Sequence, residues 1–109
     1  MKFYIKRDKS NVDAILEYDK EKKLFIVLKG SRVSDSIAHS EKFRGAKSIE
    51  RARGNGVVVE CVVTKNVQFK SASTAANFVT GASTNGLIVW KSKDGRTMKA
   101  VLEGGQKDE

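Results

Sequence analysis

Two apolar segments joined by a short polar turn constrain the fold of this 109-residue chain more than any other feature. Between residues 12 and 18, apolar side chains alternate with acidic ones, which is the pattern of a strand with one buried face. Residues 24–28 are apolar throughout, as expected for a strand in the middle of a sheet. The polar segment 19–23 connects them, so the sequence predicts an antiparallel hairpin.

Further strand signals lie on both sides of this hairpin. Phe3 and Ile5 alternate with polar residues, which favours a short edge strand. Residues 57–64 are β-branched or apolar at nearly every position and carry the strongest strand signal in the chain. Residues 67–69 and 87–90 are shorter apolar segments, and we predict the latter as a strand after the turn at Asn85 and Gly86.

Helical spacing appears in two places. Apolar residues recur every three positions from Phe43 to Ala52, which predicts a short helix within residues 37–52 that ends before the glycines at 54 and 56. Residues 71–81 contain a serine for the N-cap, alanines in the first turn and a closing glycine, Gly81. For residues 97–102 a short helix and a last strand both remain open.

These elements predict one small α+β domain. We expect a mostly antiparallel sheet of about five strands with two or three short helices over residues 1–103. Residues 104–109 are polar and glycine-rich and are predicted to form a flexible C-terminal tail. A chain of this length leaves no room for a catalytic domain together with a second module.

Charge and composition narrow the location and the partners. The formal net charge is +8, and the excess of basic residues is densest in residues 41–70. Such an excess attracts polyanions, although it also keeps a protein soluble. No apolar segment approaches transmembrane length, and the N-terminal residues lack the apolar core of a signal peptide. We therefore expect a cytoplasmic protein without a membrane role.

The residues needed for catalysis are scarce. His39 is the only histidine, with Asp35 four residues before it, and we interpret it as a solvated surface residue. Cys61 is the only cysteine and lies in an apolar segment, which favours a small buried side chain over a nucleophile. Two such residues cannot form a structural zinc site. The sequence therefore predicts no enzyme activity, no metal and no cofactor.

Basic side chains form the first candidate binding site. On the predicted helix within 37–52 they share a face different from the apolar one, and a second basic group follows Trp90. A phosphate backbone and plain solvent exposure are equally compatible with this pattern. The candidate phosphate contacts are Arg44, Lys47, Arg51, Arg53, Lys91, Lys93 and Arg96.

A second candidate site is the segment 71–102, which together with Phe69 carries a recognisable signature. Its spaced serines, glycines, Asn-Gly pair and tryptophan resemble the bacterial DUF4357 family, a domain of unknown function, and the resemblance spans roughly residues 12–102. The signature is similar to that of the RAMA (restriction adenine methylase-associated) domain. Its motif residues here are Ser71, Ser73, Gly81, Asn85, Gly86 and Trp90.

The resemblance implies an accessory module of restriction–modification and GIY-YIG-type nuclease proteins. This chain departs from the family at Ala72, where proline is usual, and at Leu87, where tryptophan is usual. Losing the tryptophan removes an aromatic ring that either stacks on a base or fills the core. The motif residues themselves also suit helix caps, a turn and a buried tryptophan without any ligand.

Two functions therefore remain open. The leading hypothesis is a non-catalytic accessory domain that contacts nucleic acid, DNA in particular, through a basic face. The alternative is a protein-interaction or scaffolding module that docks through a sheet edge or an apolar patch. A continuous positive face formed by the central helix and the loops after Trp90 would favour the first.

Overall fold

The structure, a computed structural model, describes residues 1–37 and 46–107. Its centre is a four-stranded antiparallel sheet in the order β1-β2-β3-β6, and a separate two-stranded sheet pairs β4 with β5. Within the described residues the strands are β1 (Lys2–Arg7), β2 (Val12–Asp19), β3 (Leu24–Val27), β4 (Val58–Val59), β5 (Val62–Val63) and β6 (Val67–Phe69). The helices are α1 (Ala46–Arg53), α2 (Ala72–Thr80), α3 (Gly86–Val89) and α4 (Met98–Lys107). The α+β class and the antiparallel sheet are confirmed.

The predicted hairpin is β2–β3, and its register follows the alternation in the sequence. Leu16 pairs with Val27 and both are fully buried. On β1, Phe3 and Ile5 are buried, as predicted for an edge strand with one apolar face. β3 lies between β2 and β6, which confirms the interior position of the apolar segment at 24–28.

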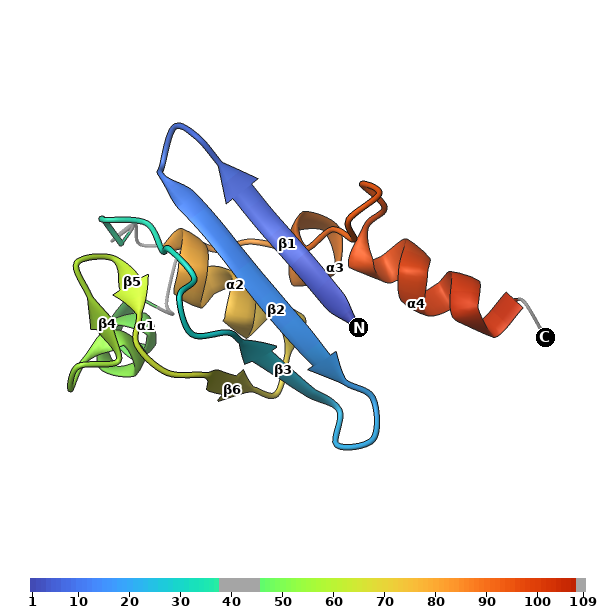
Figure 1. The fold of residues 1–109 in the computed structure, drawn as a ribbon, viewed down its shortest axis with the longest axis horizontal. Helices are drawn as coiled ribbons and strands as arrows, with labels where there is room; N and C mark the ends of the chain where they lie inside the picture. Colours follow the sequence, from blue (N-terminus) through green and yellow to red (C-terminus); the bar gives the residue numbers. More distant parts are fainter. Residues whose placement is uncertain (38–45, 108–109) are drawn as a thin grey trace.

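One face of the sheet is covered by α2 (Figure 1). α2 contacts β2, β3 and β6, and α3 packs on α2. The core between these layers includes Phe78, Val79 and Trp90, each at most 1% exposed. α4 extends from the body at the opposite end of the molecule from α1, β4 and β5. The other face of the sheet carries no helix among the described residues.

The prediction of one long strand over residues 57–64 is wrong. These residues form the hairpin β4–β5, in which Val58 pairs with Val63 and Val59 with Val62. The two loop residues, Glu60 and Cys61, have φ angles of 51° and 65°. Two successive left-handed residues make the tight turn that suits the twist of a hairpin. Glutamate and cysteine do not predict such a turn, which usually contains glycine or asparagine.

The prediction of a strand at residues 87–90 is also wrong. Residues 87–89 belong to α3, and Trp90 is the C-cap of this helix. Asn85 caps its first turn: the Leu87 backbone N–H donates to Asn85 Oδ1 at 3.1 Å. The cap and the packing of Gly86 against α2 override the β propensity of the apolar residues that follow. Of residues 97–102, left open between helix and strand, residues 98–102 belong to α4, and Thr97 forms an isolated β-bridge with Lys91. This helix continues to Lys107 and so includes the first four residues of the predicted tail.

Candidate functional site

The signature residues hold α3 against α2. Ser71 caps α2 by accepting a hydrogen bond from the Thr74 N–H at 3.0 Å, and Gly81 ends the helix in the left-handed conformation with φ 72°. Ser73 Oγ accepts a bond from the Gly86 N–H at 2.9 Å, which ties the start of α3 to the first turn of α2. Serine and glycine at these positions are therefore required by helix ends and helix contact.

Gly86 and Trp90 complete this contact. A Cβ atom on Gly86 would lie 2.2 Å from the carbonyl carbon and oxygen of Ala72, so only glycine permits the approach. The Trp90 indole is fully buried, and its Nε1–H donates to the same Ala72 carbonyl at 3.0 Å. Each motif residue thus has a structural partner, which accounts for the signature without a ligand.

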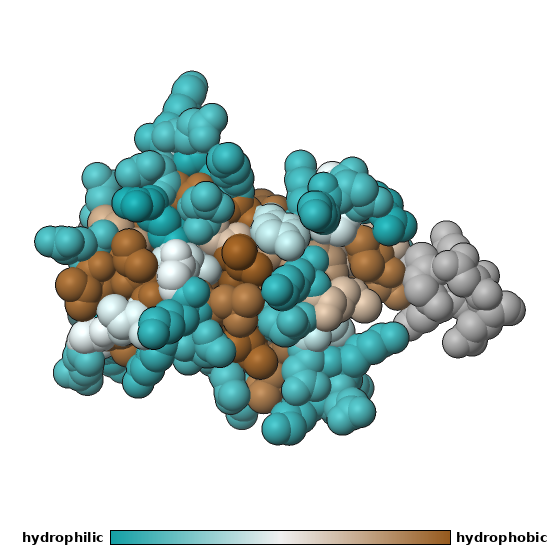
Figure 2. Space-filling view, in the orientation of Figure 1, coloured by the Kyte–Doolittle hydropathy of each residue, from teal (hydrophilic) through white to brown (hydrophobic). Residues whose placement is uncertain are grey.

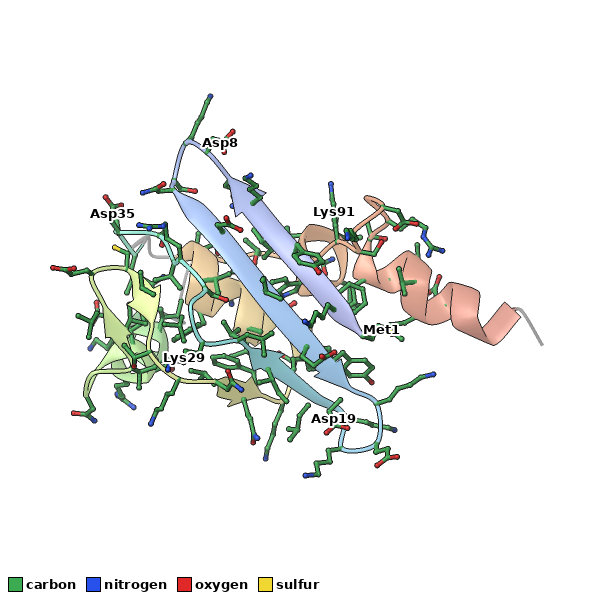
Figure 3. The ribbon with its side chains drawn as sticks, in the orientation of Figure 1. Met1, Asp8, Asp19, Lys29, Asp35 and Lys91 are labelled. Atoms are coloured by element: carbon green, nitrogen blue, oxygen red, sulfur yellow. The ribbon has the colours of Figure 1, made fainter. Side chains whose placement is uncertain are left out.

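The docked tryptophan fixes the segment that follows it. The Met98 N–H donates to the Trp90 carbonyl at 2.8 Å, and Lys91 pairs with Thr97 across the same turn. On its other side Lys91 joins the edge of the sheet: the Tyr4 N–H donates to its carbonyl at 2.7 Å, and its N–H donates to the Tyr4 carbonyl at 3.0 Å. The signature therefore places a lysine beside β1 (Figure 3).

A groove of about 280 Å³ follows this edge, between β1 and the α3–α4 segment. A neighbouring depression of about 280 Å³ shares Tyr4 and Lys6 with it. We call the two together the β1 groove. Its basic lining residues are Lys6, Arg7, Lys91 and Lys93, all exposed at the surface. An acidic lining residue, Asp13, lies beside Lys6 in the strand register.

Arg96 lies in the turn that borders this groove and already has an acidic neighbour. Its Nε–H donates to Asp94 Oδ2 at 3.0 Å, with both side chains 61% exposed. The hydrogen bond from Ser92 Oγ, and to a smaller extent Arg96, lowers the pKa of Asp94 below its usual value. Asp94 therefore stays ionised at neutral pH and offsets the charge of Arg96.

The basic residues of α1 lie away from the β1 groove. Lys47 and Arg51 are exposed at the end of the molecule formed by α1, β4 and β5, whereas Lys91 lies across the sheet from them (Figures 1 and 3). Arg44 and His39 lie outside the described residues. The basic residues that the sequence predicted as phosphate contacts, where the structure describes them, thus separate into two groups along a molecule 43 Å long. They do not form one continuous face.

Arg53, predicted as a phosphate contact, is used inside the fold. Its Nε–H and an Nη2–H donate to the Phe78 carbonyl at 3.0 and 2.7 Å. Nη1 donates to the Ser34 carbonyl at 2.9 Å, and Nη2 also donates to the Ser34 hydroxyl at 3.1 Å. Burial lowers the pKa of Arg53 from its ordinary value, with Cys61 acting in the opposite direction. This guanidinium joins α1, the end of α2 and the Ser34 segment.

Sequence reasoning missed Tyr4, Lys6 and Arg7 as members of the β1 groove. They lie more than 80 positions before Lys91, and only the antiparallel contact between β1 and the segment after α3 brings them together. The alternation of β1 indicated that Tyr4 and Lys6 share the face opposite Phe3. Nothing in the sequence identified their neighbour.

Other kinds of site find little support in the described residues. No group of three or more histidine, cysteine, aspartate or glutamate side chains within 1–37 and 46–107 is arranged to hold a metal ion. No helix in the same part of the chain is long and apolar enough to cross a membrane. Cys61 is half-buried against the core, and Asp35 is exposed.

Comparison with known proteins identifies the family. The model of the domain of unknown function DUF4357 matches residues 3–102, so the chain belongs to that family. The match includes β1, which the resemblance seen in the sequence had left outside. No curated protein and no solved structure matches the chain significantly.

Proposed function

We propose that this DUF4357 domain is a non-catalytic accessory module that binds nucleic acid through the β1 groove. DNA in a restriction–modification or other DNA-processing setting is the first candidate. The net charge of +8 supplies a general attraction for polyanions. The groove supplies a place where that attraction is concentrated on one surface.

The observation that carries the proposal is that four exposed cations line two neighbouring depressions, which share Lys6. Lys6 and Arg7 come from β1, and Lys91 and Lys93 come from the segment after α3. Basic residues from two distant parts of the chain thus line each of the two depressions. The backbone of Lys91 is held by two hydrogen bonds to Tyr4, which fixes where its side chain starts.

Such a surface suits contacts to phosphate oxygens. Lysine and arginine side chains position a protein on a nucleic acid backbone and carry no sequence information by themselves. About four such contacts would give a slope of log affinity against log salt near −3 to −4 on duplex DNA. Affinity should therefore be strongest in dilute buffer and fall steeply as salt is added.

Fluorescence anisotropy with a labelled duplex tests this proposal. The double variant Lys6→Ala/Lys91→Ala should weaken binding and reduce the salt slope by about two, because each lost phosphate contact removes about one unit. The matched control is Lys47→Ala/Arg51→Ala, which removes the same charge at the α1 end. If both variants lost the same affinity for the duplex, net charge alone would explain the loss, and a site at the β1 groove would be refuted.

A protein-interaction module is the second candidate, and one observation favours it. Leu87 and Ile88 on α3 are 39% and 45% exposed, an unusual position for two consecutive large apolar side chains. Under this alternative, the affinity for a protein partner would be insensitive to salt and would survive Lys6→Ala/Lys91→Ala. It would be lost in the variant Leu87→Ser/Ile88→Ser.

A further inference from the structure

The uncovered face of the sheet continues the β1 groove with a row of side chains that runs across the strands. Lys91 pairs with Tyr4, and Tyr4 pairs with Ile15. Leu28 follows next, because its N–H donates to the Ile15 carbonyl at 2.9 Å. Residues paired in this way place their side chains on the same face. We call Tyr4, Ile15 and Leu28 the apolar row.

The apolar row is separate from the hydrophobic core. Phe3 and Leu16, which alternate with Tyr4 and Ile15 along their strands, point to the helix layer and are fully buried. Tyr4, Ile15 and Leu28 are each half-buried, and none of them packs against the core cluster. Figure 2 shows apolar side chains across this face over the sheet, bordered by hydrophilic ones. Each side chain of the apolar row therefore keeps part of its surface open to a ligand.

Cations lie at one end of the apolar row and beside it. Lys91 ends it at the β1 edge, and the adjacent row contains Lys6, Asp13 and Arg32 in register. Lys93 lines the depression beside Tyr4. The nearby acid Glu17 is already paired with the amino group of Met1. An aromatic and aliphatic strip with an excess of exposed positive charge at its border is complementary to a polyanion that also has flat apolar groups.

We propose that the ligand of this face is single-stranded nucleic acid, with unpaired bases on the apolar row and phosphates at the surrounding lysines and arginine. This inference rests on the proposed function and names its substrate class. In a duplex the bases are stacked inside and phosphates line the surface, so the half-buried side chains of the apolar row cannot reach the base faces. Unpaired bases stack readily on aromatic side chains, and an open four-stranded sheet face accommodates two or three of them.

The length of the row agrees with this ligand. Neighbouring strands are about 4.8 Å apart, so the three steps from Lys91 to Leu28 span about 14 Å. Tyr4 supplies the only ring in the row, and Ile15 and Leu28 supply apolar contact for a second base. The structure therefore assigns a site for two or three nucleotides without base specificity.

Anisotropy titrations with a labelled oligothymidine and a labelled duplex of equal length test the inference. The wild-type domain should bind the single strand more tightly. Tyr4→Ala should weaken single-strand binding about tenfold, the loss of one stacked base, and change duplex binding less than about twofold. Tyr4→Phe keeps the ring and should keep the affinity, whereas Tyr4→Leu keeps only the apolar contact and should lose most of it. Circular dichroism confirms that each variant is folded.

The outcomes separate this inference from the proposal on which it rests. Duplex binding at the groove with no preference for the single strand would overturn the inference and leave the proposed function standing. No binding of either probe in dilute buffer would overturn both. Sedimentation velocity on the same samples tests a different occupant, a second copy of the chain. A dimer at micromolar concentration that Ile15→Lys dissociates would contradict the inference.

Discussion

Two basic regions of this molecule differ in what holds them in place. The α1 end presents Lys47 and Arg51 on one side of a short helix, while its third basic residue, Arg53, is used in four hydrogen bonds to α2 and the Ser34 segment. The β1 groove gathers Lys6, Arg7, Lys91 and Lys93 from opposite ends of the chain. The density of basic residues along the sequence indicates the α1 end as the binding region. Their arrangement in space indicates the β1 groove.

The comparison shows why charge runs are weak evidence for a binding site. Basic residues close together in the sequence of a helix lie on different parts of its surface. One of them can also form hydrogen bonds inside the fold, as Arg53 does. Charges brought together by a strand edge and a docked helix line two adjoining depressions even though the sequence separates them. The predictions below test this distinction, starting with the largest expected effect.

Arg53→Ala should be the most damaging change in either region. It removes four hydrogen bonds from a charged donor and leaves the Phe78 and Ser34 carbonyls unpaired, so we expect the free energy of unfolding to fall by about 3 kcal/mol. Urea denaturation measures the change. Its matched control on the same helix, Arg51→Ala, should stay within about 0.5 kcal/mol of the wild type. If Arg53→Ala lowered the free energy of unfolding as little as Arg51→Ala, the structural role of Arg53 would be contradicted.

Gly86→Ala should destabilise the fold and change the β1 groove by moving α3. The added methyl group has to displace the backbone of Ala72, and we expect a cost of about 2 kcal/mol together with a shift of α3 away from α2. Because α3 leads directly to Lys91, nucleic acid binding should weaken as well. Gly95→Ala is the control: it also replaces a glycine near the groove, with open space around its Cβ and strain only from its φ of 91°. Thermal denaturation and anisotropy report the two effects separately.

The paired charge variants give the next largest effect. Lys6→Ala/Lys91→Ala should weaken duplex binding about tenfold in dilute buffer, because each exposed charge contact is worth up to about 1 kcal/mol. Lys47→Ala/Arg51→Ala should change it less than about threefold, through net charge alone. The order of these two affinities is the measured quantity. A reversed order would restore α1 as the binding surface.

Asp94→Asn should produce the smallest change, and in the opposite direction. It removes the acidic partner of Arg96 at the border of the groove, so affinity for nucleic acid should rise about twofold. Since the pKa of Asp94 is lowered, mainly by Ser92, the carboxylate is ionised across the neutral range and the gain should be equal at about pH 6 and about pH 8. Glu21→Gln, in the β2–β3 turn, makes the same change in net charge far from the groove and should leave affinity unchanged.

The fold was predictable wherever local pattern decides structure. Alternation gave β1 and the β2–β3 hairpin, and the cap residues Ser71 and Gly81 delimit α2 as predicted. The errors came where a local contact overrides propensity. The β-branched segment 57–64 contains a turn at Glu60 and Cys61, and the apolar residues 87–89 form a helix because Asn85 caps it.

The candidate site was only half predictable. Lys91 and Lys93 were identified by their charge, but Tyr4 and Lys6 became visible as their neighbours only through the pairing of β1 with the segment after α3. The buried role of Arg53 was hidden as well, because the carbonyls that bind it belong to Ser34 and Phe78, 19 and 25 residues away. Charge alone does not tell a solvated arginine from one bonded inside the fold.

The account depends on the β1 groove and the adjoining sheet face being the surface that meets nucleic acid. Two-dimensional amide NMR during titration with a short single-stranded oligonucleotide tests this directly. We predict shifts at Tyr4, Lys6, Lys91 and Lys93, with the amides of Lys47 and Arg51 in α1 unmoved. Shifts confined to α1, or none anywhere in dilute buffer, would contradict the account.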